Sequence, residues 1–138
     1  MRWLEQVAVS AGLLLGLMQP TLPCGWNWMV PGYFVMVAAF DGFLRDPLMS
    51  WIAIGFLAAV ASVVLAFLSK WGVAGGLAVI GWCVFAVAVL VLLSYKSPIG
   101  VGLWTLLVTL AAHSFFSLKW HLQRRKNAPG LPRSDGRL

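Results

Sequence analysis

Long uncharged runs of hydrophobic residues alternate with short polar connections over most of the chain. Three runs carry no charged side chain: Ser50 to Leu68, Val73 to Leu93 and Ile99 to Leu118. At about 1.5 Å per helical residue, each run is long enough for the roughly 30 Å hydrocarbon core of a bilayer. The pattern therefore predicts transmembrane helices at about 50–68, 73–93 and 99–118, and the short connections require neighbouring helices to run antiparallel.

The first third of the chain has a different pattern. No charge lies between Gln6 and Phe40, but Pro20, Pro23 and Pro31 interrupt the middle of this stretch. Two full spans and a turn need more than about forty residues. We therefore predict one span at about 3–18, followed by an apolar segment at about 29–44 that is too short to cross. This segment is expected to be re-entrant or to lie in the interface.

Composition supports a membrane location. Of the 138 residues, 61% are hydrophobic and 10% are charged, whereas a soluble domain has about 25% charged residues. A soluble chain of this size has too much surface to hide so many apolar side chains. The fold predicted is therefore all-α, a polytopic membrane protein in which residues 1–118 form an up-down bundle of four transmembrane helices with one extra short apolar segment after the first.

The net charge of +6 is concentrated at the C-terminal end. Residues 119–138 hold six basic residues against one acidic residue, Asp135; the basic ones are Lys119, Arg124, Arg125, Lys126, Arg133 and Arg137. A basic run beside a span is typical of a cytoplasmic segment, so 119–138 is predicted to be a basic cytoplasmic tail. Its first four cations are expected to act in retention or to contact anionic lipid head groups. Nucleic-acid binding is not expected, because Trp120 is the tail's single stacking aromatic.

Counting basic residues on each side favours four spans over five. With four spans, Arg2, Lys70 and the tail lie on one side, while Arg45 and Lys96 lie on the other. Five spans move Arg2 to the poorer side, so the positive-inside rule favours both termini in the cytoplasm of a multi-pass cell (inner) membrane protein. Tryptophans prefer head-group depth, and in this topology seven of the eight lie near a boundary: Trp3, Trp71 and Trp120 inside, and Trp26, Trp28, Trp51 and Trp104 outside.

Small residues recur at helical spacing on the first three predicted spans. Ala8, Gly12 and Gly16 are four residues apart on the first, and Gly72 and Gly76 begin the third. Such faces let a second helix approach closely. They are expected to serve as helix-packing faces, either within the chain or toward another subunit.

The last predicted span carries a row of polar residues. Thr105, Thr109, His113, Ser117 and His121 recur every four residues and therefore share one helix face. A polar face is costly against lipid, so this face should turn toward protein or water. Two explanations remain open. The polar groups hold neighbouring helices together, or Thr105, Thr109, His113 and Ser117 line a hydrophilic path with a titratable histidine.

Catalytic and ligand-binding patterns are absent from the sequence. It contains no HExxH motif, no Ser-His-Asp set and no phosphate-binding glycine loop. His113 and His121 lie about 12 Å apart on one helix, so a single haem iron cannot take both. Cys24 and Cys83 have no metal-ligand spacing, and Trp82 and Cys83 are expected to pack in the core. We predict no enzyme activity, no cofactor and no metal.

These features predict a small non-catalytic integral membrane protein. It is expected to act as an accessory or structural subunit of a membrane complex through helix–helix contacts, either with other membrane proteins or by self-association. The alternative is a transporter or channel for ions or small solutes, in which a homo-oligomer surrounds a polar path along the last span. In both cases the chain contacts the lipid bilayer.

Overall fold

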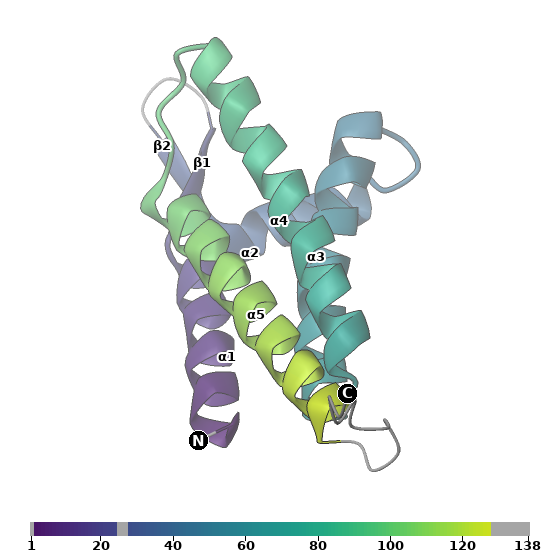
Figure 1. Ribbon diagram of the computed structural model, residues 1–138. Coiled ribbons are helices and arrows are strands. Elements are labelled where there is room, and N and C mark those ends of the chain that lie inside the picture. The colour runs from purple at the N-terminus through teal and green to yellow at the C-terminus, as the bar shows by residue number, and fades with distance from the viewer. Residues whose placement is uncertain (1, 25–27, 128–138) are drawn as a thin grey trace, which may run out of the picture.

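The computed structural model describes residues 2–24 and 28–127 (Figure 1). The described part forms five helices and one β-hairpin. In chain order the elements are α1 (Arg2–Met18), β1 (Pro20–Cys24), β2 (Trp28–Pro31), α2 (Gly32–Asp41), α3 (Pro47–Phe67), α4 (Trp71–Ser94) and α5 (Val101–Lys126).

Three helices are long and apolar enough to cross a membrane within the described ranges: α3, α4 and α5. The three uncharged runs of the sequence are thereby confirmed as candidate spans, and the chain is a multi-pass membrane protein in contact with lipid. Helix α5 continues to Lys126, so residues 119–126 of the expected tail are helical. Arg133 and Arg137 lie outside the described residues.

The long helices alternate in direction (Figure 1). Helices α1 and α4 run one way and α3 and α5 the other, so α1 begins and α5 finishes at the same end of the bundle. We call this the terminal end, and the opposite one the hairpin end. Helix α5 packs between α1 and α4, α4 packs on α3, and α1 makes only a small contact with α3.

The proline-rich break after α1 is a two-stranded antiparallel hairpin. Pro20 pairs with Pro31 and Cys24 pairs with Trp28, with a register irregularity between Pro20 and Leu22. Proline is tolerated where a strand edge needs no N–H donor, and both strands of a two-stranded sheet are edge strands. The prolines predicted the interruption, but not that it would be extended and paired.

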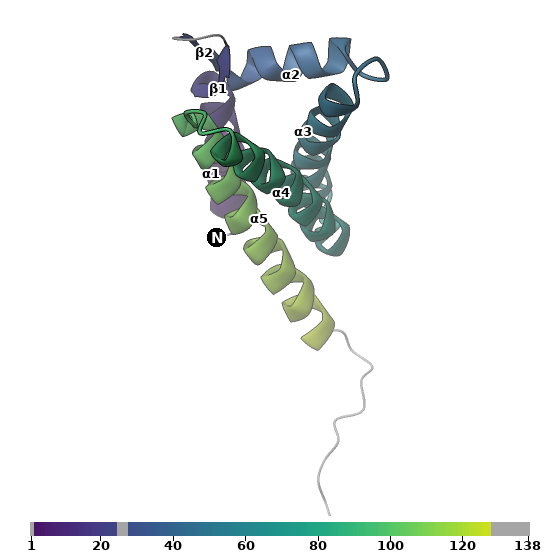
Figure 2. The same cartoon turned by 90° about the horizontal axis from the view of Figure 1, so that it is seen from above.

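The short apolar segment predicted at 29–44 contains helix α2. Its 10 residues span about 15 Å, which is too short to cross a bilayer. From the hairpin, α2 runs crosswise to α1 and leads to the start of α3 (Figure 2). Asp46 then caps α3: its Oδ1 accepts hydrogen bonds from the backbone N–H of Leu48 (2.7 Å) and of Met49 (3.4 Å).

Small residues bring α3 and α4 close together in the core. A Cβ on Gly55 would lie only 2.6 Å from a methyl group of Val84. Beside this contact the rings of Phe56 and Phe85 meet edge to face, with centroids 5.0 Å apart. The expectation that Trp82 and Cys83 pack in the core is wrong. Both are exposed on α4, because the face of that helix turned to the bundle carries Gly81, Val84 and Phe85 instead.

Candidate functional site

The polar row of α5 begins at the hairpin end, where Thr105 meets α1. The Thr105 hydroxyl lies 2.9 Å from the side-chain oxygen of Gln19 and 2.9 Å from the carbonyl oxygen of Val101. A hydroxyl has one proton, so it donates to one of these acceptors at a time. Thr105 therefore finds its partners within the chain.

One turn further along, Thr109 packs against Gly12 of α1. A Cβ on Gly12 would lie 2.7 Å from the Thr109 hydroxyl oxygen and 3.0 Å from its methyl group. Gly16, one turn away, faces Leu106 and the backbone of Gly102 in the same way. Gly12 and Gly16 thus let α1 lie directly on the polar row of α5.

His113 and Ser117 are the buried members of the polar row. Their side chains are 3% and 0% exposed, and His113 lies beside the backbone of Ser62 in α3. Within the part of the chain that the structure describes, His113 Nε2 and Ser117 Oγ have no hydrogen-bond partner. The polar row is therefore half-buried at Thr105 and Thr109 and closed by the chain's own helices at His113 and Ser117, so it is not a continuous open path.

A second group of polar side chains joins α1 to α5 at the terminal end. The indole N–H of Trp120 donates a hydrogen bond of 2.5 Å to Glu5 Oε2, and the Arg2 guanidinium lies 4.4 Å from the centre of the Trp120 ring. Gln6 donates to the carbonyl oxygen of Ala66 in α3 (3.0 Å). These side chains surround a cavity of about 10 Å³ that reaches His113, which is close to the space that one water molecule occupies.

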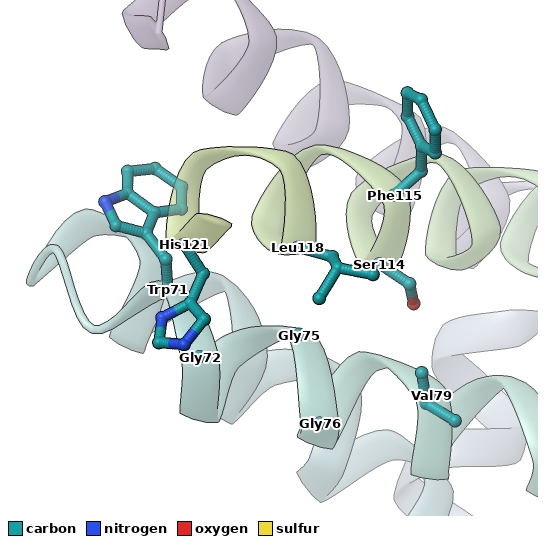
Figure 3. A pocket seen from close by; sticks show the side chains of 9 residues that line it. All are labelled: Trp71, Gly72, Gly75, Gly76, Val79, Ser114, Phe115, Leu118 and His121. Carbon is teal, nitrogen blue, oxygen red and sulfur yellow. The ribbon is translucent and has the colours of Figure 1, made fainter. Parts of the chain in front are cut away.

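A larger hollow of about 440 Å³ lies between α4 and α5 on the outside of the bundle (Figure 3). We call it the α4–α5 groove. Nine residues line it: Trp71, Gly72, Gly75, Gly76, Val79, Ser114, Phe115, Leu118 and His121. A Cβ on Gly76 would meet nothing within 4 Å, so the groove is open at this glycine of α4.

At the terminal end the groove leads into a basic hollow of about 330 Å³. Trp71, Gly72 and His121 border both hollows, and Lys70 and Arg124 border the second. Arg124 is held in place because its Nη1 donates to the carbonyl oxygen of Ser69 (3.1 Å). The mostly apolar α4–α5 groove therefore ends at Lys70, His121 and Arg124.

The structure separates the predicted packing residues into three groups. Gly12 and Gly16 contact α5, as described above. Gly72 lies against the His121 ring, which a Cβ would approach to 3.0 Å. Ala8 is exposed on the outer side of α1, and Gly76 opens into the groove.

The basic residues also take different positions. Lys119 lies 5.8 Å from the centre of the Trp120 ring, and Arg124 borders the basic hollow. Arg125 and Lys126 are exposed on the last turn of α5.

Sequence reasoning did not identify several residues of these sites. Gln19 and Glu5 lie outside any motif, and their partners are more than 80 positions away in the chain. Gly75 packs against Ser117 although only Gly72 and Gly76 have four-residue spacing. The sequence signal for Glu5 is its place two residues from Trp3, which the predicted topology puts at the same membrane boundary as Trp120.

Comparisons of the chain with protein-family models, with curated proteins and with solved structures found no match. Across residues 2–24 and 28–127, no group of three or more His, Cys, Asp or Glu side chains is placed to hold a metal ion.

Proposed function

We propose that this protein is a small non-catalytic accessory or structural subunit of a membrane complex, which acts through contacts between helices. The observation that carries this proposal is the burial of His113 and Ser117, the inner members of the polar row of α5. Thr109 lies on Gly12, while His113 and Ser117 are buried among the chain's own helices. What the spanning helices offer to the outside is mainly apolar, and such surfaces suit lipid or the helices of another membrane protein.

The topology that we propose has four spans with both termini in the cytoplasm. Helix α1 would be the fourth span: its 17 residues give about 25 Å, and it lies along α5 in the bundle (Figure 1). The excess of basic residues at the terminal end supports its placement on the cytoplasmic side. Helix α2 would then lie near the outer interface.

A membrane-impermeant maleimide is expected to label Cys24 in intact cells. In the four-span topology Cys24 follows the first span and faces the outside, whereas a fifth span would place it inside. Cys83 is the internal control: it lies in the middle of α4, where it remains unlabelled because the reagent does not enter the hydrocarbon core. The measurement is the mass added by the maleimide to the Cys24→Ser and Cys83→Ser variants, each of which keeps one cysteine. Labelling of Cys24 only after the cells are lysed would refute this topology.

The outer side of α1 is the partner-contact face that we propose. Leu4, Ala8, Ala11 and Leu15 are all exposed there and follow a 4-3-4 spacing, which aligns them on one side of the helix. Two small residues between two leucines allow a second helix to approach closely while the leucines pack around it.

Replacing Ala8 by phenylalanine is expected to lower recovery of the complex at least tenfold without unfolding the chain. Because Ala8 is exposed, the larger side chain meets no part of its own bundle but keeps a partner helix away. The measurement is the stoichiometry of membrane protein, self or other, that co-purifies with the tagged chain in mild detergent. Ala111→Phe is the matched control, since Ala111 is an exposed alanine on α5.

The competing function, transport by a homo-oligomer, is favoured by one observation. Thr105 and Thr109 border an open hollow of about 300 Å³ on the outside of the bundle, which copies of the chain could enclose. Under our proposal His113→Leu leaves co-purification unchanged, because the histidine is buried inside its own bundle. A solute flux in vesicles that needs the wild-type protein and is abolished by His113→Leu and Thr109→Val would overturn the accessory role in favour of transport.

A further inference from the structure

We propose that the α4–α5 groove and the basic hollow together bind one anionic phospholipid. An acyl chain would lie in the groove, and the head-group phosphate would lie among Lys70, His121 and Arg124. This inference is independent of the subunit role proposed above, because the partner-contact face lies on α1.

The groove has the chemistry of an acyl-chain site. Gly72, Gly75 and Gly76 form one wall without side chains, while Val79, Phe115 and Leu118 supply apolar surface. Ser114 is the one hydroxyl residue of the lining, and its Oγ donates to the Leu110 carbonyl oxygen (2.8 Å). A hydrocarbon chain can therefore fill the groove without leaving that donor unpaired.

The basic hollow has the chemistry of a phosphate site. Arg124 uses one N–H on the Ser69 carbonyl oxygen, which fixes the guanidinium and leaves its other donors for an anion. Lys70 borders the same hollow, and His121 stands between hollow and groove. Of the acidic residues that the structure describes, Glu5 pairs with Trp120, and Asp41 and Asp46 lie at the hairpin end.

The order of these features matches a phospholipid better than a partner helix. From Val79 to Lys70 the lining changes from apolar to cationic over about 13 Å of helix, and a phospholipid has its chain and phosphate in the same order. The cations lie at the end of the membrane-spanning segment, where head groups are found. A partner helix in this groove would need an acidic residue of its own at the level of these cations, whereas an anionic phospholipid brings its phosphate to that depth.

Native mass spectrometry of the full-length protein in mild detergent tests the proposal. The probes are phosphatidylglycerol and phosphatidylcholine with identical acyl chains. The wild type is expected to retain phosphatidylglycerol at least fivefold better, and neutralising a cation costs roughly fivefold. Lys70→Gln with Arg124→Gln should therefore lower phosphatidylglycerol binding to the phosphatidylcholine level, whereas Arg125→Gln, on an exposed part of the same turn, should not.

A larger side chain inside the α4–α5 groove tests the part of the proposal that places an acyl chain there. Gly76→Leu is expected to reduce retention of both lipids at least fivefold, and circular dichroism should show a folded protein because the side chain enters open space. Ala111→Leu, on a surface outside the groove, is the control. Equal retention of the two lipids by the wild type would overturn the proposal. So would a Gly76→Leu protein that keeps its lipid but loses a co-purifying membrane protein, since a helix would then occupy the groove.

Discussion

Replacing Gly102 by alanine is expected to destabilise the protein by roughly 1–3 kcal/mol, while the same change at Gly76 is expected to cost nothing. A Cβ on Gly102 would lie 2.7 Å from the Gly16 carbonyl oxygen and 2.8 Å from that of Gln19. Both are backbone atoms, which cannot rotate away as a side chain does. The whole end of α1 must move from α5 to admit one methyl group.

The two substitutions form a matched pair because both glycines lie in helices and both changes add one methyl group. Alanine has a higher helix propensity than glycine, so this effect stabilises both variants in the same direction. The difference between their unfolding midpoints therefore measures the close approach of α1 to α5. The measurement is the SDS mole fraction at half unfolding in mixed micelles, followed by circular dichroism. If Gly102→Ala and Gly76→Ala unfold at the same SDS mole fraction, Gly102 does not lie against the backbone carbonyl oxygens of Gly16 and Gln19.

Replacing Trp120 by phenylalanine is expected to cost about 2 kcal/mol, because hydrogen bonds to charged groups contribute about 1.5–3 kcal/mol. The variant keeps an aromatic ring for the Arg2 guanidinium but removes the N–H that bonds Glu5 at 2.5 Å. The half-buried carboxylate is then left without this donor. The end of α1 should loosen from α5, which lowers the unfolding midpoint in the same SDS titration.

Trp104→Phe is the control for this change, since the Trp104 side chain is 49% exposed and lies at the opposite end of α5. A double-mutant cycle of Glu5→Gln with Trp120→Phe separates the pair from the loss of indole surface. We expect a coupling energy of about 1 kcal/mol or more. Equal losses at Trp104 and Trp120, with no coupling to Glu5, would show that the hydrogen bond contributes nothing to stability.

The sequence was sufficient to predict the three spanning helices and the short apolar helix, because their signals are local. An uncharged run such as 73–93 is visible from hydropathy alone. The prolines at 20, 23 and 31 indicate where the uncharged stretch in the first third of the chain is interrupted. The paired strands were not predictable in this way. Antiparallel pairing of Pro20 with Pro31 depends on the direction in which the chain leaves α1, which no short window contains.

The candidate sites show the same division. Four-residue spacing placed Thr105, Thr109, His113 and Ser117 on one face, but which neighbour covers that face is a property of the assembled bundle. Gln19 reaches Thr105 across 86 positions and Glu5 reaches Trp120 across 115. Gly76 illustrates the limit most clearly: it has the spacing of a packing glycine, yet it opens into the α4–α5 groove.

The central position of α5 has a consequence for how the protein is made. Helix α5 lies between α1 and α4, and α1 has little contact with α3. During translation α5 leaves the ribosome after the other described helices, so α1 lies in the membrane without its main neighbour until α5 has been synthesised. The order of synthesis therefore separates the insertion of α1 into the membrane from its packing in the bundle, which becomes possible only when α5 is present.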